Sequence, residues 1–467
     1  MHGARCASQP NGNGPRRPID FQYLVTSMLD IDAFLTSYDP SDLPGASIDP
    51  MGFERGYLYL AEKVLPALTN VAAVPRYFSM LCAGASMAKV SPGASNREQR
   101  EARRDAAMRL ERLWALSNYL APQGLTGLNG LRGVRYVAAE AQRLEKAGQS
   151  NADSDYKLLS RQTAYGVLGI YGAVAGELLF FSDRDALELS PDAGLRLAES
   201  FREETNMPAK MEKAVQGEAA ISLSALAKWG EVAFMRGPYG ASEAACLDEA
   251  LVRDPVRARM CELLEKRPFG ENETELGRLK AIAAQLASSN LNADLCDAIQ
   301  AIVAYEAVYA WCVLGFERLL FLCREATVPV SDVARSHDPV LTRVAAALPA
   351  LVRTLEDLLT HPNTPHVGAH PEPLADVREF LRRVAEVSSN VVATSDLIFQ
   401  RHAEVQSGKF DRGRRKLAWI ERTSAGMSLT MTRTGGAMGE ITSHTDVRPH
   451  FYRLAAADAF IAAREYA

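Results

Sequence analysis

The sequence lacks the short motifs by which most enzymes are recognised. It contains no G-x-x-x-x-G-K-[ST] phosphate loop, no G-x-G-x-x-G after a predicted strand, and neither H-E-x-x-H nor G-x-S-x-G. Its seven cysteines include no C-x-x-C pair, which excludes the usual zinc-ligand spacings and favours reduced, buried thiols. We therefore expect no resident cofactor and favour a protein that is not an enzyme.

An excess of positive charge is also missing. The net charge is −5, so nucleic acid can be held only by a local basic patch. The most apolar stretch, residues 164–181, contains Glu177 and several small residues, which favours a buried helix over a membrane span. The first 18 residues have no apolar run, so we expect a disordered tail and a cytoplasmic protein without membrane contact.

Helical periodicity dominates residues 19–406, where alanine and leucine fill amphipathic segments. We expect about 60% helix, well above the globular average. Proline and glycine cluster near residues 236–242, which predicts a boundary between two helical bundles. The predicted organisation of this mostly α protein is a tail at 1–18, helical domains at 19–236 and 237–406, and a C-terminal segment at 407–467.

The C-terminal segment has a different pattern from the helical part. Met427, Leu429 and Met431 alternate with polar residues after a T-S-A-G turn, and this period of two predicts a β-hairpin. Residues 448–467 have a helical pattern again. We therefore expect a small α+β segment that contains the hairpin.

Positive charge is concentrated just before this hairpin, because residues 409–422 have a net charge of +4. The candidate nucleic-acid-binding residues, which combine phosphate-contacting cations with one stacking aromatic, are Lys409, Arg412, Arg414, Arg415, Lys416 and Trp419. The alternative is a solvated loop that leads into the hairpin, with Trp419 packed inward. The first interpretation predicts DNA or RNA as a partner. The sequence does not decide between the two interpretations.

Glycine recurs at every third position between residues 124 and 133, and Arg132 and Arg135 follow into a predicted helix. Backbone N–H groups of such a turn, a helix N-terminus and two arginines are able to bind an anion together. The alternative is a bend in which glycine lets two helices approach closely. The leucines that alternate with the glycines favour the bend.

Seven of the eight histidines lie after residue 336. Glu440, His444, Asp446 and His450 stand within eleven residues of each other. Imidazole and carboxylate at short spacing are able to hold a divalent metal that activates water. These four residues are the candidate metal site.

Several short blocks carry a family resemblance. Residues 49–83 contain L-P-A-L-T at 65–69 and R-Y-F-S-M-L-C at 76–82, in which Arg76 is expected to be exposed at the start of an apolar helix. With S-R-Q-T-A-Y-G at 160–166, they resemble blocks of uncharacterised, mostly helical bacterial proteins found among phage-defence and mobile-element genes. The resemblance implies a defence role beside other subunits of a multi-gene system, and it implies no catalytic residues.

Three functions follow from the sequence. The first is an accessory subunit of a bacterial defence system that binds nucleic acid or partner proteins. The second is a metal-dependent hydrolase or nuclease that uses the C-terminal histidines and acidic residues. The third is a helical scaffold with no nucleic-acid contact.

Overall fold

The computed structural model describes residues 49–125, 127–287, 293–323, 338–360, 372–387, 389–411, 414–424, 426–430 and 441–466. These residues are 66% helical, and their strands form only two-stranded antiparallel sheets. The expected mostly α fold is therefore confirmed, and so is the hairpin, in which β7 (Ile420–Thr423) pairs with β8 (Gly426–Leu429). The predicted tail at 1–18 lies outside the described residues.

The helices follow one another along the chain from α3 to α21. They are α3 (Glu54–Val64), α4 (Arg76–Ser86), α5 (Asn96–Leu120), α6 (Val134–Lys146), α7 (Gln162–Tyr165), α8 (Val167–Glu177), α9 (Arg196–Glu204), α10 (Met211–Val215), α11 (Leu223–Val232), α12 (Ala241–Val252), α13 (Pro255–Lys266), α14 (Glu275–Ala287), α15 (Ala293–Leu322), α17 (Pro339–Thr360), α19 (Glu372–Glu386), α20 (Val391–Ser407) and α21 (Leu454–Ala463).

Three further short ladders tie loops together between the helices. Strand β1 (Asn151–Ala152) pairs with β4 (Ile221–Ser222), β2 (Phe181–Asp183) with β3 (Glu188–Leu189), and β5 (Phe410–Asp411) with β6 (Arg414–Arg415). Each pair is antiparallel. Because these strands are so short, the sheets only connect loops to one another. The core is built by helices.

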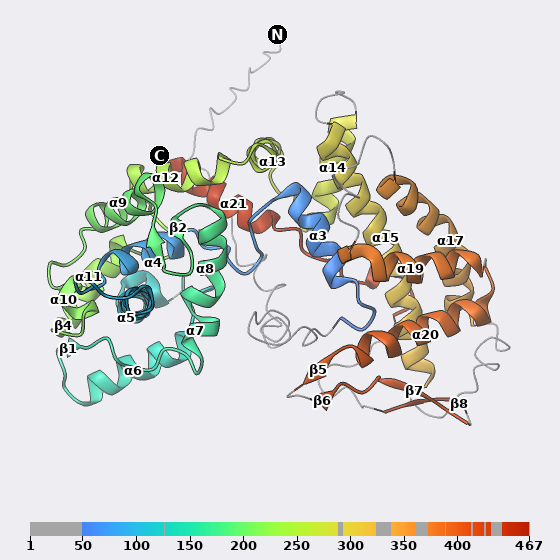
Figure 1. The fold of residues 1–467 in the computed structure, drawn as a ribbon, viewed down its shortest axis with the longest axis horizontal. Helices are drawn as coiled ribbons and strands as arrows, with labels where there is room; N and C mark the ends of the chain where they lie inside the picture. Colours follow the sequence, from blue (N-terminus) through green and yellow to red (C-terminus); the bar gives the residue numbers. More distant parts are fainter. Residues whose placement is uncertain are drawn as a thin grey trace, which may run out of the picture.

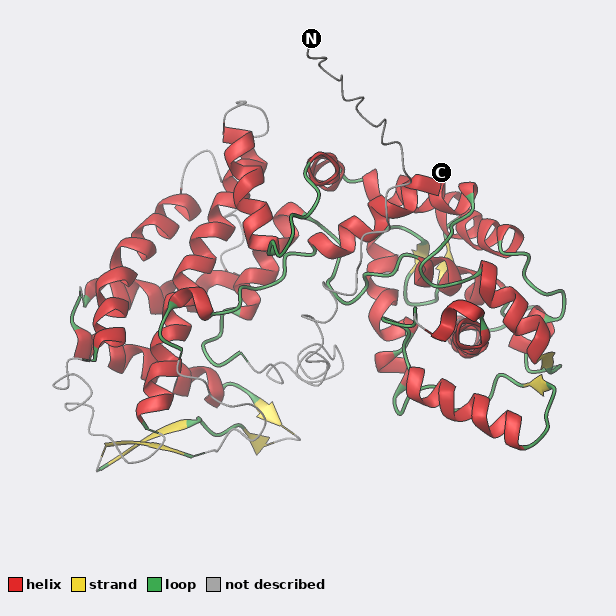
Figure 2. Ribbon diagram, turned by 180° about the vertical axis from the view of Figure 1, so that it is seen from behind, coloured by secondary structure: helices red, strands yellow, loops and turns green. Residues whose placement is uncertain are grey.

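Two helical lobes make up the molecule, and they are joined in the middle by α3, α13 and α21 (Figure 1). One lobe holds α4–α12 and the other holds α14–α20, as the view from behind also shows (Figure 2). Helix α3 packs on α15 and α19 of the second lobe, whereas α21 packs on α12 and α13. Segments from both ends of the described chain therefore hold the lobes together.

Local sequence signals fix where individual helices begin. At the start of α5, the Ser95 hydroxyl accepts from the backbone N–H of Glu98, whose carboxylate accepts from the N–H of Ser95. At the start of α13, Asp254 is the N-cap and Pro255 occupies the first helical position. These caps satisfy N–H groups that a helix leaves without an internal partner.

Helix α15 forms the centre of the second lobe. It packs against α3, α14, α17 and α20. Within the described part of the chain it is the one helix long and apolar enough to cross a membrane, and 67% of its most apolar window is buried inside the fold. An apolar helix surrounded by other helices is typical of the core of a bundle.

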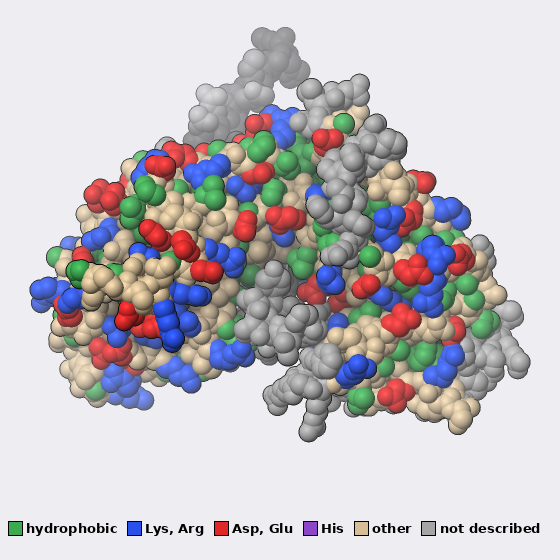
Figure 3. Space-filling model, in the orientation of Figure 1, with side chains coloured by type: hydrophobic (Ala, Val, Ile, Leu, Met, Phe, Trp, Pro, Cys, Tyr) green, Lys and Arg blue, Asp and Glu red, His purple; other side chains and the backbone are tan. Residues whose placement is uncertain are grey.

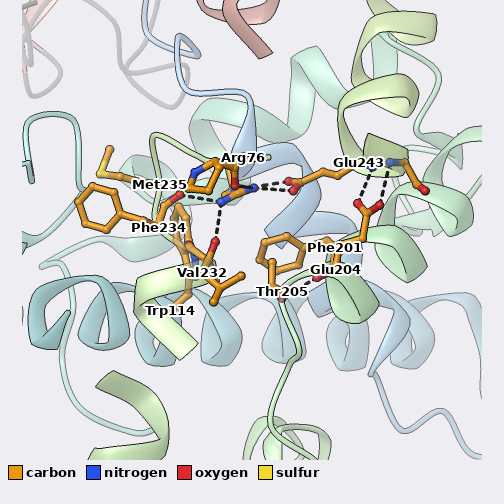
Figure 4. A network of polar contacts seen from close by, with 12 residues as sticks. Arg76, Trp114, Phe201, Glu204, Thr205, Val232, Phe234, Met235 and Glu243 are labelled. Carbon is orange, nitrogen blue, oxygen red and sulfur yellow. Dashed lines mark hydrogen bonds and ion pairs between the residues drawn. The ribbon is translucent and has the colours of Figure 1, made fainter. Parts of the chain in front are cut away.

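A buried ion pair between α4 and α12 holds the first lobe together (Figure 4). Arg76 donates to the Glu243 carboxylate from Nε at 3.2 Å and from Nη2 at 2.7 Å. Its other N–H groups donate to the backbone oxygens of Val232, Phe234 and Pro238 at distances of 3.0, 2.9 and 2.7 Å. The guanidinium therefore has acceptors all around it, which is the condition for burying a charge without a large cost.

The exposure expected for Arg76 is wrong. Its side chain is 1% exposed and that of Glu243 is fully buried. Arg76 is buried because its hydrogen-bond acceptors come from a distant part of the chain. The nearest of them along the sequence, Val232, is 156 positions away. A pattern that covers one helix gives no sign of such a partner.

Replacing Arg76 with methionine should lower the free energy of unfolding by about 3–5 kcal/mol, because the change leaves Glu243 buried without a positive partner. Denaturant unfolding followed by circular dichroism measures this loss. In the control Arg97→Ala, the lost side chain is 87% exposed and pairs only with Glu101 one turn away, so the expected change is below about 1 kcal/mol. Equal losses for the two variants would show that the buried pair is not a main support of the lobe.

Candidate functional site

The basic segment before the hairpin is divided between the interior and the surface. Lys409 is 8% exposed, and its Nζ donates to the backbone oxygen of Asp49. Burial lowers the pKa of Lys409. Trp419 is half-buried, with its ring centre 5.9 Å from that of Phe316 and 5.5 Å from that of His402. Lys409 and Trp419 therefore make contacts inside the fold.

Of the remaining residues of this segment, the structure describes those in and just after the short strand β6. Arg414 and Arg415 form β6, and Arg415 is exposed. Lys416 is half-buried, and its backbone N–H donates to the backbone oxygen of Lys409 at 2.9 Å. Arg412 lies outside the described residues. Arg414, Arg415 and Lys416 are therefore consecutive residues at and just after β6, with Arg415 at the surface.

Side chains of α20 form hydrogen bonds with the chain segment that leads into α3. The His402 Nδ1 donates to the backbone oxygen of Pro50 at 3.0 Å, and its Nε2 accepts from the backbone N–H of Trp419 at 2.8 Å. These two bonds require the neutral tautomer with the proton on Nδ1. The neighbouring Arg401 donates from Nε to the backbone oxygen of Met51 at 3.0 Å. The segment before α3 and the segment before β7 are thereby fixed to the same helix.

The candidate metal residues that the structure describes make other contacts. His450 Nδ1 lies 2.7 Å from the carboxylate of buried Glu306. The ring of His444 stacks on Trp311 with 4.5 Å between ring centres. The Asp446 carboxylate accepts from the backbone N–H of Ser443 at 3.1 Å.

No group of three or more His, Cys, Asp or Glu side chains that could hold a metal occurs within the described ranges. Glu440, the fourth predicted ligand, lies outside them. The metal site therefore stays a prediction from sequence, and the contacts of His450 and His444 supply no further support for it.

The glycine run forms the connection between α5 and α6. Gly133 is the residue before α6, with a φ of +72°. A Cβ at this position would collide with the backbone oxygen of Leu158, so glycine is needed both for the backbone angle and for the close approach. Arg132 donates from Nη1 to the backbone oxygen of Tyr165 at 3.1 Å and from Nη2 to that of Val71 at 3.3 Å. These contacts favour the bend over an anion cradle formed by the glycines.

The same bend assembles a group of positive and aromatic side chains. Lys157 Nζ lies 5.5 Å from the ring centre of Tyr136, and the Arg161 guanidinium lies 5.4 Å from that of Tyr165. Arg132 is joined to Tyr165 by the hydrogen bond above, and Arg135 is exposed at the start of α6. We call this group the basic face; its members are Arg132, Arg135, Tyr136, Lys157, Arg161 and Tyr165.

Little negative charge opposes the basic face. Residues 112–139 and 156–176 contain no aspartate or glutamate. The buried Glu111 lies beneath and accepts hydrogen bonds from Gln162 Nε2 and the backbone N–H of Val167. Burial raises the pKa of Glu111 to about 7, so its negative charge is only partly present at neutral pH. Figure 3 shows Lys and Arg side chains gathered at the lower edge of this lobe, where α6 and α7 lie.

Comparison of the chain with protein-family models, with curated proteins and with solved structures gives no match. The function is therefore inferred from the side chains themselves. Sequence reasoning singles out Arg132 and Arg135 but misses Lys157, Arg161 and the two tyrosines. The signal that was available is the long interval without an acidic residue on both sides of α6.

The ring of His402 should titrate with a midpoint near pH 4, because burial lowers its pKa from 6.5 to about 4. As the pH falls from 6.5 to 4, the unfolded chain takes up this proton before the folded protein does, so the fold loses stability. The expected loss over that interval is about 3 kcal/mol, at 1.36 kcal/mol per pKa unit.

Nuclear magnetic resonance of the histidine rings measures the midpoint directly. Denaturant unfolding of wild type and His402→Asn at pH 7 and pH 4.5 measures the pH-dependent part of the stability. The difference in free energy of unfolding between the two proteins should be smaller at pH 4.5 than at pH 7. A midpoint near 6.5 would show that the His402 ring is accessible to water.

Proposed function

We propose that this protein is an accessory, non-enzymatic subunit of a bacterial defence system and that it binds nucleic acid through the basic face. The observation that carries the nucleic-acid part is the set of four positive side chains around two tyrosines, on segments free of acidic residues. The defence part rests on the resemblance of residues 49–83 and 160–166 to blocks of helical proteins from phage-defence genes. Such a role fits a cytoplasmic protein with partner subunits from the same gene cluster.

The charge distribution supports binding of phosphates at one place. Each lysine or arginine that neutralises a phosphate releases condensed counterions, which provides affinity without sequence preference. Arg135, Lys157 and Arg161 are the side chains proposed to contact phosphates, whereas Arg132 is held by backbone oxygens. Because the protein as a whole has a net charge of −5, most of its surface does not attract the same ligand.

The tyrosines favour single-stranded nucleic acid. In the basic face, Tyr136 is 38% exposed and Tyr165 is half-buried. Bases of a single strand are free to stack on aromatic rings, which contributes about 1–3 kcal/mol per base. In a duplex the bases are stacked on each other, so these rings would find no partner there.

Arg414, Arg415 and Lys416 are a second proposed contact. Strands β5 and β6 lie at the lower edge of the second lobe, and α6 and α7 lie at the lower edge of the first (Figures 1 and 2). A single strand bound along this edge would be able to meet both groups of positive charge.

The triple variant Arg135→Ala/Lys157→Ala/Arg161→Ala should bind a labelled single-stranded oligonucleotide more weakly at low salt. Three phosphate contacts give a slope of log affinity against log salt of about −2, at roughly −0.7 per contact on single strands. The triple variant should lose this part of the slope, whatever the base sequence. Fluorescence anisotropy at several salt concentrations measures the affinity and the slope together.

A matched control removes the same charge from other exposed positions. Lys89, Arg97 and Arg382 have side chains 71%, 87% and 59% exposed, and their triple alanine variant should keep the parental slope. Arg414→Ala/Arg415→Ala tests the second contact and should reduce the slope by about one to two units. If the basic-face variant binds DNA and RNA like the parent, the proposal is wrong and a helical scaffold is favoured.

A further inference from the structure

The second lobe contains a polar pocket that the proposed function does not use. Its volume is about 640 Å³, and it lies where the start of α3 meets α19, α20 and the residues after α20. This volume is within the usual range for pockets that bind small molecules. Three cationic side chains, those of Arg55, Arg401 and Lys409, and four carboxylates line it.

Arg401 is the central residue of the pocket. It is 8% exposed, and its Nε is occupied by the backbone oxygen of Met51 at 3.0 Å. No described residue accepts a hydrogen bond from its Nη1 or Nη2. A Cβ at Gly52, which also lines the pocket, would lie 2.7 Å from Nη2. Arg401 therefore lines the pocket beside Gly52, and no described residue occupies its Nη donors.

The Nη1 and Nη2 groups of a guanidinium are able to donate two parallel hydrogen bonds from the end of the side chain. A carboxylate or a phosphate is suited to accept both of them. Burial lowers the pKa of Arg401, and the nearby charge of Asp376 is the strongest opposing influence on that pKa. The pocket therefore offers an anion-binding end with a carboxylate close to it.

The four carboxylates that line the pocket disfavour a ligand that is only anionic. Asp376 is exposed on α19 and accepts no hydrogen bond from a described residue. Glu404 pairs with Arg383 at a distance of 3.4 Å, and the Asp49 carboxylate accepts from backbone N–H groups at the start of α3. Asp376 is the carboxylate whose charge acts most strongly on Arg401, so we assign to it the positive group of a ligand held by Arg401.

We propose that this pocket binds a small zwitterion of the amino-acid type. The ligand carboxylate would accept hydrogen bonds from Nη1 and Nη2 of Arg401, and its ammonium group would face Asp376. The two opposite charges of the ligand match the neighbouring positive and negative charges of Arg401 and Asp376. The inference does not rest on nucleic-acid binding, because the basic face belongs to the other lobe.

Isothermal titration calorimetry of the full chain tests the proposal, with glycine, L-leucine, L-glutamate and L-arginine as separate probes. At least one of them should bind saturably. Acetate and methylamine, which each carry one of the two charges, should bind about ten-fold more weakly or not at all, since a hydrogen bond to a charged group accounts for about that factor.

Two variants locate the site. Asp376→Asn, at an exposed position, and Arg401→Lys, which keeps the charge but loses the paired donors, should each weaken binding by about ten-fold or more. Glu199→Gln, in a different pocket beside α9, is the matched control and should bind like wild type. Circular dichroism checks that Arg401→Lys is folded, and Asp376→Asn serves as the test if it is not.

Three results would overturn the proposal. The first is that none of the four amino acids binds. The second is that acetate binds as tightly as the best amino acid, which would leave an anion site only. The third is that Asp376→Asn binds the probe with wild-type affinity.

Discussion

A buried guanidinium is stabilised where oxygen atoms accept hydrogen bonds from its N–H groups, and this need joins distant parts of the chain. Arg76 meets it with a loop from beyond α11 and thereby closes the first lobe. Arg257 on α13 donates to the backbone oxygen of Pro66, just after α3. Arg278 on α14 pairs with Asp458 on α21. The last two contacts involve the helices that join the lobes. The hydrogen bonds of these buried arginines therefore help to fix the junction.

The parts of the fold that could be predicted from sequence depend on neighbours in the chain. A helix needs a repeating apolar face and suitable ends, and both are local, as Ser95 and Glu98 show at α5. The hairpin was recognisable because Met427 and Leu429 alternate with polar residues in the sequence, and Met427 is 1% exposed in β8. For the glycine run, the bend was favoured because leucines alternate with the glycines and are able to cover the core.

The parts that could not be predicted depend on partners far along the chain. Lys409 has the composition of a surface cation, but its acceptor, the backbone oxygen of Asp49, is 360 positions away. Trp419 is held beside His402, whose ring is fixed in turn by Pro50. The basic face needs the bend at Gly133 to bring its two segments together. In each case the sequence supplies the chemical group, and only the fold decides whether the group faces water.

The position of α3 has a consequence for how the protein is made. Phe53, at its start, accepts a hydrogen bond on its backbone oxygen from Tyr305 of α15, 252 positions further on, and the two rings pack edge to face. At a synthesis rate of about 5–20 residues per second, α3 leaves the ribosome roughly 10–50 s before that partner exists. During this time no helix of the second lobe exists to cover the apolar side of α3, while α4 to α12 are already available to fold. A helix that is synthesised ahead of the whole first lobe is therefore placed only after that lobe is complete.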